Sequence, residues 1–231
     1  MTQSPANGSA AGAPRPDTSD MYAVHGVFRD TLGAAPALVG GVAAADTERL
    51  AVVANYYENV LSFLEAHHDG EEQLVFPLLR ERCPDQAGLL DELAEQHDEA
   101  LTKLRAARQW LAAWPGAGDS AQLEVVGALG ELRTHLVEHL DEEERLGLPL
   151  AAEYLSMEEW GQLPGHGLAA FDGDKVWLIL GLIRERMNEE QRVAMLAHMP
   201  QPAVDMWTGF GEHAFNELAS QVVVEVQNRV P

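Results

Sequence analysis

The chain has 231 residues, of which 46% are apolar and 23% charged, as in ordinary globular proteins. Its formal net charge of −22 argues against nucleic acid and anionic membrane surfaces as partners, because both would repel a surface of this sign. The one cysteine, Cys83, excludes an internal disulfide and a thiolate metal site. No apolar run reaches about 18 residues and the first residues lack the features of a secretory signal, so we expect a cytoplasmic protein without a membrane segment.

In chain order, the sequence predicts helices and hardly any strand. Residues 1–17 are rich in Ser, Ala, Gly and Pro, and we expect a disordered tail there. Pro115 and Gly116 are expected to stop the third helix, and Pro77 and Pro149 to end the second and fourth. Apolar residues spaced by three and four predict four helices, over 20–33, from Asp46 to about Arg80, over 85–112 and over 119–148.

The C-terminal part of the chain is also predicted to be helical. The segment QLPGHGLAAFDGD, residues 162–174, predicts a loop, and the helices around it are expected over 173–187, 189–198 and 202–226. We therefore expect an all-α protein with a four-helix bundle over 18–158 and a C-terminal helical extension over 159–231 that packs on the bundle.

Positions spaced alternately three and four apart face the core of a helical bundle, so the inward face of each helix can be predicted. The first and third helices each carry one histidine on this face, and the second and fourth each carry a histidine followed one turn later by a glutamate. The predicted inward positions are Met21, His25, Phe28 and Leu32; Leu50, Val53, Tyr57, Val60, Leu64, His67, Glu71, Leu74 and Leu78; Leu90, Leu93, His97, Ala100, Leu104, Ala107 and Leu111; and Val125, Leu129, Leu132, Leu136, His139, Glu143, Leu146 and Leu150.

Burying imidazoles and carboxylates in an apolar bundle costs several kcal/mol per ionised group unless a partner compensates. No lysine or arginine occupies the inward faces, so a multivalent cation is the expected partner. The pattern also repeats, since 42 residues separate His25 from His67 and His97 from His139, with an offset of 72 between the two halves. Two helical hairpins related by an approximate two-fold axis are expected to enclose a pair of metal ions. Without sulfur ligands, iron or manganese is favoured, and zinc less distinctively.

The stretches HGVFRDTL, HHDGEEQLVFPLL, EQHDEAL and HLVEHLDEEERLGLPL resemble the hemerythrin-like family of HHE cation-binding bundles, over roughly residues 20–155. The resemblance implies an up-down-up-down bundle with two non-haem iron ions that bind O2 or take part in oxygen, peroxide, nitric oxide or iron chemistry. The oxygen carriers of the family have a further histidine where this chain has Leu93, which favours oxidative or peroxide chemistry over O2 storage. Carried over by position, the metal ligands are His25, His67, Glu71, His97, His139 and Glu143.

Other polar residues near this set give weaker signals. His68 and Glu72 lie about 100° away from the inward direction, and we expect His68 to be an exposed partner of Glu72 rather than a ligand. His135, one turn before His139, fits a seventh ligand, a group behind the ligands or a flanking polar residue. Glu72 and Glu144 fit either acceptors of hydrogen bonds from ligand imidazoles or solvated surface residues.

Three functions stay open. The preferred one is a di-iron protein that binds or reacts with O2, peroxide or NO. The second is a di-iron oxidase or oxygenase acting on a small organic substrate, with peroxide decomposition as a related enzymatic activity. The third is a non-catalytic module that senses or stores iron, in which metal loading stabilises the fold. The expected partner is a small diatomic or peroxide ligand, and the protein is expected to be a monomer or a homodimer.

Overall fold

The structure, a computed structural model, describes residues 15–227 apart from the side chains of residues 119, 198 and 223–227. Every regular element in this range is helical and none is a strand, so the all-α prediction is confirmed. None of the described helices combines the length and apolar character that a membrane span requires. The disordered tail predicted for residues 1–17 falls almost entirely outside the described residues.

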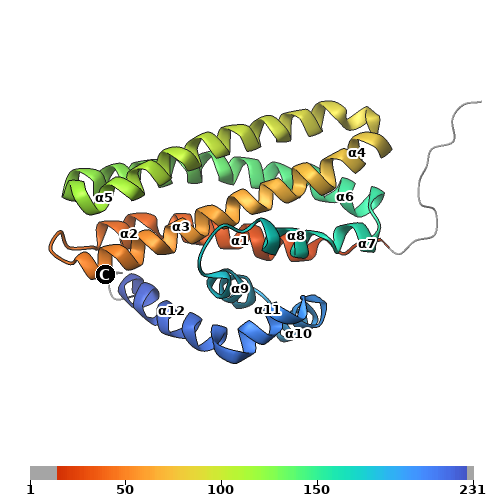
Figure 1. The fold of residues 1–231 in the computed structure, drawn as a ribbon. Coiled ribbons are helices and arrows are strands. Elements are labelled where there is room, and N and C mark those ends of the chain that lie inside the picture. The colour runs from red at the N-terminus through yellow and green to blue at the C-terminus, as the bar shows by residue number, and fades with distance from the viewer. Residues whose placement is uncertain (1–14, 228–231) are drawn as a thin grey trace, which may run out of the picture.

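Four helical rods lie side by side in an up-down-up-down bundle (Figure 1). Rod one is α1 (Ser19–Gly33), and the short helix α2 (Ala35–Gly40) lies in the connection that follows it. Rod two begins with α3 (Thr47–Gly70), which is capped by Asp46, whose side chain accepts a hydrogen bond from the Arg49 backbone N–H at 2.9 Å. The helix α5 (Ala87–Glu142) doubles back on itself, and its two arms supply rods three and four.

The turn inside α5 lies at Gly118, later than predicted. Gly118 has φ 61° and ψ −143°, a conformation accessible essentially to glycine alone. Helical structure continues through Pro115 and Gly116, so the prediction that these residues stop the third helix is wrong. A proline this close to the end of an arm removes one hydrogen bond without disrupting the turns before it.

Two wide π turns interrupt rods two and four at matching places. In rod two, α3 runs into η1 (Glu71–Val75) and then α4 (Phe76–Arg82), and in rod four α5 runs into η3 (Glu143–Gly147) and then α6 (Leu148–Tyr154). The N–H that closes each turn bonds to the carbonyl five residues back, as π geometry requires. Pro77 and Pro149 follow in the first turns of α4 and α6, where a missing N–H is tolerated, so the prediction that they end their helices is wrong.

Each π turn moves the inward face of its rod by one residue, because a wide turn holds one residue more than an α turn. Up to Glu71 and Glu143, every predicted inward position of the four rods is buried. Beyond them the prediction is wrong by one position. The buried residues there are Val75 and Leu79 instead of Leu74 and Leu78, and Gly147 and Ala151 instead of Leu146 and Leu150.

A polar layer divides the core of the bundle into two apolar clusters. The larger cluster includes Phe28, Leu64, Ala100 and Leu136, each one turn from a histidine on its rod. The smaller cluster lies on the other side of the layer and includes Met21, Phe76, Leu93 and Leu148. The layer is therefore shielded from water along the bundle axis in both directions.

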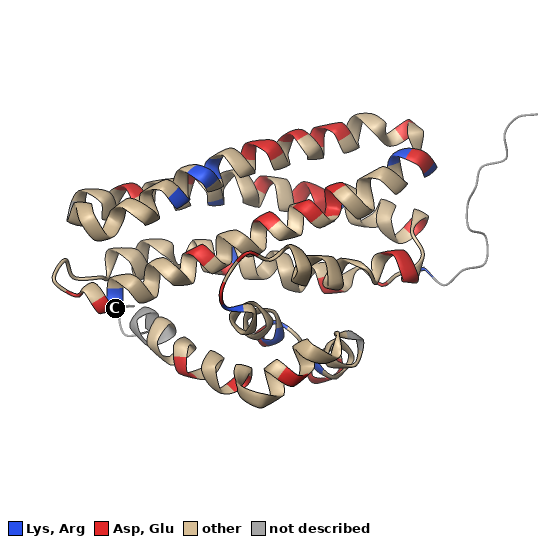
Figure 2. Ribbon diagram, in the orientation of Figure 1, with Lys and Arg blue, Asp and Glu red and all other residues tan. Residues whose placement is uncertain are grey.

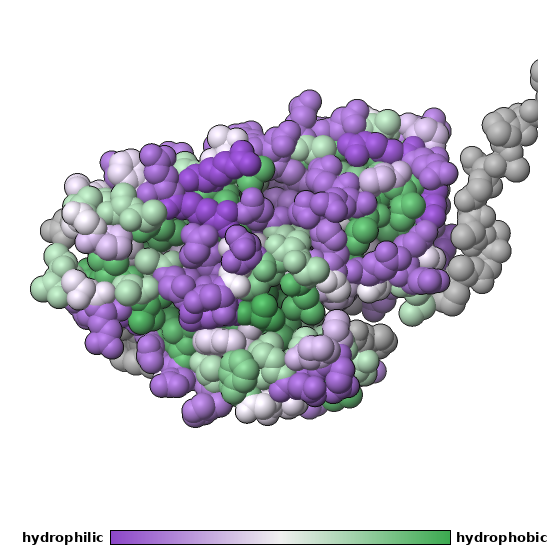
Figure 3. Space-filling view, viewed as in Figure 1, coloured by the Kyte–Doolittle hydropathy of each residue, from purple (hydrophilic) through white to green (hydrophobic). Residues whose placement is uncertain are grey.

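The C-terminal helices pack along the side of the bundle formed by α1, α2 and α3 (Figure 1). They bury Leu178, Trp207 and Phe215 in the larger core cluster. In the space-filling view, apolar side chains gather near these helices, whereas the surface over α3 and α5 is mainly hydrophilic (Figure 3). The elements are α7 (Met157–Trp160), α8 (Leu163–Ala170), α9 (Val176–Glu185), α10 (Glu189–His198), α11 (Gln201–Met206), η4 (Trp207–Gly211) and α12 (Glu212–Gln227).

The loop predicted for residues 162–174 is wrong in its first part, which forms α8. Leu163 and Leu168 of this helix pack against the two core clusters, and Leu163 lies close to Gly70 of α3. Contact with the bundle thus outweighs the Gly and Pro signals in the segment.

We expect Gly118→Ala to destabilise the protein by about 1–3 kcal/mol, because an alanine pays a steric penalty at this φ and ψ. The matched control is Gly116→Ala, which lies in helical backbone with open space around the added methyl group. Urea unfolding followed by circular dichroism measures both changes. Equal stabilities for the two variants would contradict the assignment of the turn to Gly118.

Candidate metal centre

All six predicted ligands converge in the polar layer between the four rods, and each is at most 8% exposed. They fall into two groups in which one nitrogen or oxygen atom of each member lies within 4.8 Å of those of the others. The first group is His25, His67, Glu71 and Glu143, and the second is His97 and His139 together with His68.

The two glutamates lie between the imidazoles of the two groups. Glu71 Oε1 is 3.6 Å from His67 Nε2, and its other oxygen Oε2 is 3.4 Å from His97 Nε2. Glu143 Oε2 lies 3.4 Å from His25 Nε2 and 3.7 Å from His139 Nε2. Each carboxylate therefore faces one histidine on either side, which is the arrangement expected of a bridging ligand between two ions.

Hydrogen bonds to the outer nitrogens fix two of the histidine rings. His25 Nδ1 lies 2.9 Å from Glu144 Oε1, and His97 Nδ1 lies 2.9 Å from Glu72 Oε1. A carboxylate only accepts hydrogen bonds, so each Nδ1 carries a proton, and each ring is oriented with Nε2 directed inward. Of the two roles left open for Glu72 and Glu144, the structure favours the hydrogen-bond acceptor.

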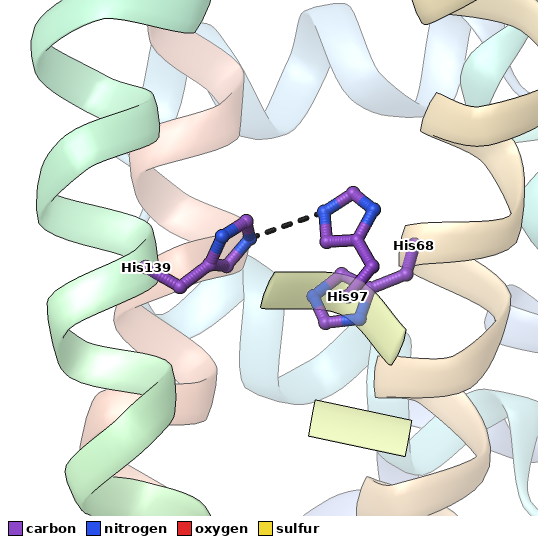
Figure 4. A group of neighbouring side chains, drawn as sticks. All are labelled: His68, His97 and His139. Atoms are coloured by element: carbon purple, nitrogen blue, oxygen red, sulfur yellow. Dashed lines mark hydrogen bonds between the residues drawn. The ribbon is translucent and has the colours of Figure 1, made fainter. Parts of the chain in front are cut away.

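A third histidine is fixed by an amide instead. His139 Nδ1 lies 2.9 Å from Gln96 Oε1, and Gln96 Nε2 donates to Glu142 Oε2 at 2.8 Å, which sets the orientation of the amide. His139 Nε2 then carries a lone pair, and it lies within hydrogen-bond distance, 3.2 Å, of His97 Nε2 (Figure 4). Nitrogens bound at right angles to one divalent ion with bonds of about 2.1 Å are about 3.0 Å apart, so the spacing suits a shared ion.

Burial sets the protonation of the cluster. Loss of contact with water lowers the pKa of His67 and His68 well below the usual range and that of His139 to about 2, with neighbouring histidines adding to the effect. Neutral imidazole is the form that binds a metal. Burial also raises the pKa of Glu71 well above its usual range, and the facing carboxylate of Glu143 raises it further. A cation between the two carboxylates would instead lower the pKa of Glu71, because it favours the charged form.

Several of these buried atoms have no hydrogen-bond partner within the described part of the chain. They are the Nε2 atoms of His25, His67 and His68, both carboxylate oxygens of Glu71, and Oε2 of Glu143. Buried polar atoms are normally paired, and all of these atoms are good ligands for transition-metal ions. The residues present therefore fit a site for metal ions.

Two residues of the polar layer were misjudged or missed from the sequence. His68, expected to be exposed, is 7% exposed and stacks on His97 with ring centroids 4.1 Å apart; Figure 4 shows the three imidazoles of the second group. The repeat offset of 72 pairs position 68 with Leu140. An apolar residue at the paired position was a sequence signal that position 68 is buried, and Leu140 is fully buried in the structure. Apart from its place next to His97, nothing in the sequence indicated that Gln96 orients a histidine of the centre.

His135 joins neither metal group in the described residues. Its Nε2 donates a hydrogen bond to the backbone oxygen of Gln96 at 2.9 Å. His135 therefore supports Gln96, whose side chain orients His139. Of the interpretations left open for His135, a polar residue behind the ligands fits best.

The family description "Hemerythrin HHE cation binding domain" matches residues 17–151. The match covers more than half of the chain, which therefore belongs to this family of metal-binding proteins. Neither the curated proteins nor the solved structures yielded a match.

We expect Glu144→Gln to weaken Co²⁺ binding about 10-fold, because the carboxylate that orients and polarises His25 is lost while its volume is kept. Glu144 also accepts a hydrogen bond from Arg29 at 2.6 Å, so its negative charge is held in place. Titration of the metal-free protein measures the affinity. The control is Glu138→Gln on an exposed position of the same rod, and an equal affinity for the two variants would contradict the role of Glu144.

Proposed function

We propose that the cluster holds two iron ions and that the protein binds or reacts with O2, peroxide or NO at this centre. The observation that carries the proposal is the position of Glu71 and Glu143, each of which faces imidazole nitrogens from both groups. Manganese fits the same donor set, since mixed imidazole and carboxylate ligation suits both metals. Paired iron supplies, when bound, the electrons and open coordination positions that such chemistry requires.

The protein's own residues hold the donors in place and keep water away along the bundle axis. Phe28 lies 5.3 Å from the His67 ring on one side of the layer, and Phe76 stacks on His97 at 5.3 Å on the other. Leu93, in the place of the further histidine of the oxygen carriers, is fully buried in the smaller core cluster and offers no donor atom. The chain thus provides fewer imidazoles than an oxygen carrier at that point, which supports a reactive centre more than a storage site.

Oxidation of an organic substrate has less support. A cavity of about 310 Å³ reaches the centre, and it is lined by residues of α3, η1 and α5 with several carboxylates among them. None of its lining residues comes from the C-terminal helices. An acidic lining disfavours apolar organic molecules.

The test is the iron content of the full chain after anaerobic loading with Fe²⁺. We expect two iron ions per chain in the wild type and at most one in His67→Ala, because this variant removes an imidazole that faces Glu71. The control is His135→Ala, which lies beside the centre and should keep two. Addition of NO or H₂O₂ to the loaded protein should change its visible absorption. One zinc per chain, or no spectral response, would contradict the proposal.

A further inference from the structure

The cavity that reaches the centre is a groove between rods two and three with acidic walls. Glu65, Asp69 and Glu72 line it from rod two, and Asp98 lines it from rod three. Figure 2 marks the Asp and Glu positions along the ribbons of both rods in red. Asp98 is exposed, whereas Glu72 is half-buried and touches the ring of His97, so carboxylates extend from the surface to the centre.

The inner end of the groove is lined by His68. His68 is 7% exposed, and its Nε2 has no hydrogen-bond partner among the described residues. The same residue belongs to the group with His97 and His139. His68 thus lies between the acidic groove and the proposed ligands, with a donor atom unused.

Stacking separates His68 from the ligands of the same group. The rings of His68 and His97 are inclined by only 15° at a centroid distance of 4.1 Å. An imidazole binds a metal in the plane of its ring, at about 2.1 Å. Two nearly parallel rings at this separation cannot both direct their lone pairs at one ion, so His68 is placed to bind a cation that His97 does not hold at the same time.

The two-fold related side of the bundle carries positive charge at the positions that correspond to the groove. The repeat offset pairs Asp98 with Gly26 and Leu101 with Arg29. Arg29 forms ion pairs with Asp141 and Glu144, and Arg186, which follows α9, lies against Gly26. The repeat also places Leu140 where the first half has His68. The acidic groove and its histidine are therefore special to one half, although the proposed ligands are shared by both.

We propose that this groove is the route by which divalent metal ions reach the centre, with His68 as the residue that passes each ion to the ligands. The proposal rests on the proposed function, since it needs a metal centre to supply. A cleft lined by charges of one sign concentrates counterions at its mouth. Arg108 pairs with Glu65, and Asp69 bonds to Gln73 and His166, so these carboxylates are held in place while Asp98 faces solvent.

The test measures the rate at which the metal-free full chain takes up Fe²⁺ under anaerobic conditions, with unbound ion captured by a chromogenic chelator after set times. We expect Asp98→Lys to slow uptake about 10-fold at low salt and progressively less as salt rises, because screening weakens the attraction. Glu131→Lys is the control, since it makes the same charge change at an exposed position on rod four, and it should alter the rate less than two-fold.

The role of His68 is tested with His68→Leu, which copies the residue found in the other half. We expect uptake to slow about 10-fold at every salt concentration, with two iron ions per chain still bound at the end. Circular dichroism checks that each variant is folded. A final content below two would make His68 a permanent ligand and overturn its transfer role. Wild-type rates in Asp98→Lys would overturn the route itself. If the wild type never binds two ions, the proposed function fails instead.

Discussion

The structure depends on one costly arrangement, a layer of imidazoles and carboxylates buried between two apolar clusters. Each such ionised group costs several kcal/mol to bury, against a total stability of about 5–15 kcal/mol for a typical domain. Hydrogen bonds to Glu72, Glu144 and Gln96 satisfy only the outer nitrogens of three rings. Metal binding, with free energies on the order of 10 kcal/mol at a protein site, is a partner of sufficient strength for the inner atoms.

The backbone places these groups by an internal repeat, and the repeat is imperfect in a way that bears on function. Both π turns begin at a glutamate of the centre, Glu71 and Glu143, so the backbone irregularity and the facing carboxylates occur together. The surroundings differ between the halves, with an acidic groove at His68 and arginines on the opposite side. In our account, equivalent ligands are therefore served by one access route rather than two.

The sequence predicted the rods and the six converging side chains because a 3–4 spacing reports directly on the inward face of a regular helix. It failed where the helix is irregular, since no local signal announced the extra residue of a π turn and the inward face moved from Leu74 to Val75. It also failed in α8, where contact with the bundle outweighs the local loop signals. It failed again at His68, because the spacing on its own helix predicts an exposed residue, whereas comparison with the buried Leu140 of the other half indicates burial.

Anomalous scattering at the iron absorption edge, from crystals of the iron-loaded full chain, tests the central claim most directly. The account predicts two peaks roughly 3.5–4 Å apart between Glu71 and Glu143, with two or more histidine nitrogens near each. Peaks confined to the acidic surface, or a polar layer without any metal peak in the loaded protein, would contradict it.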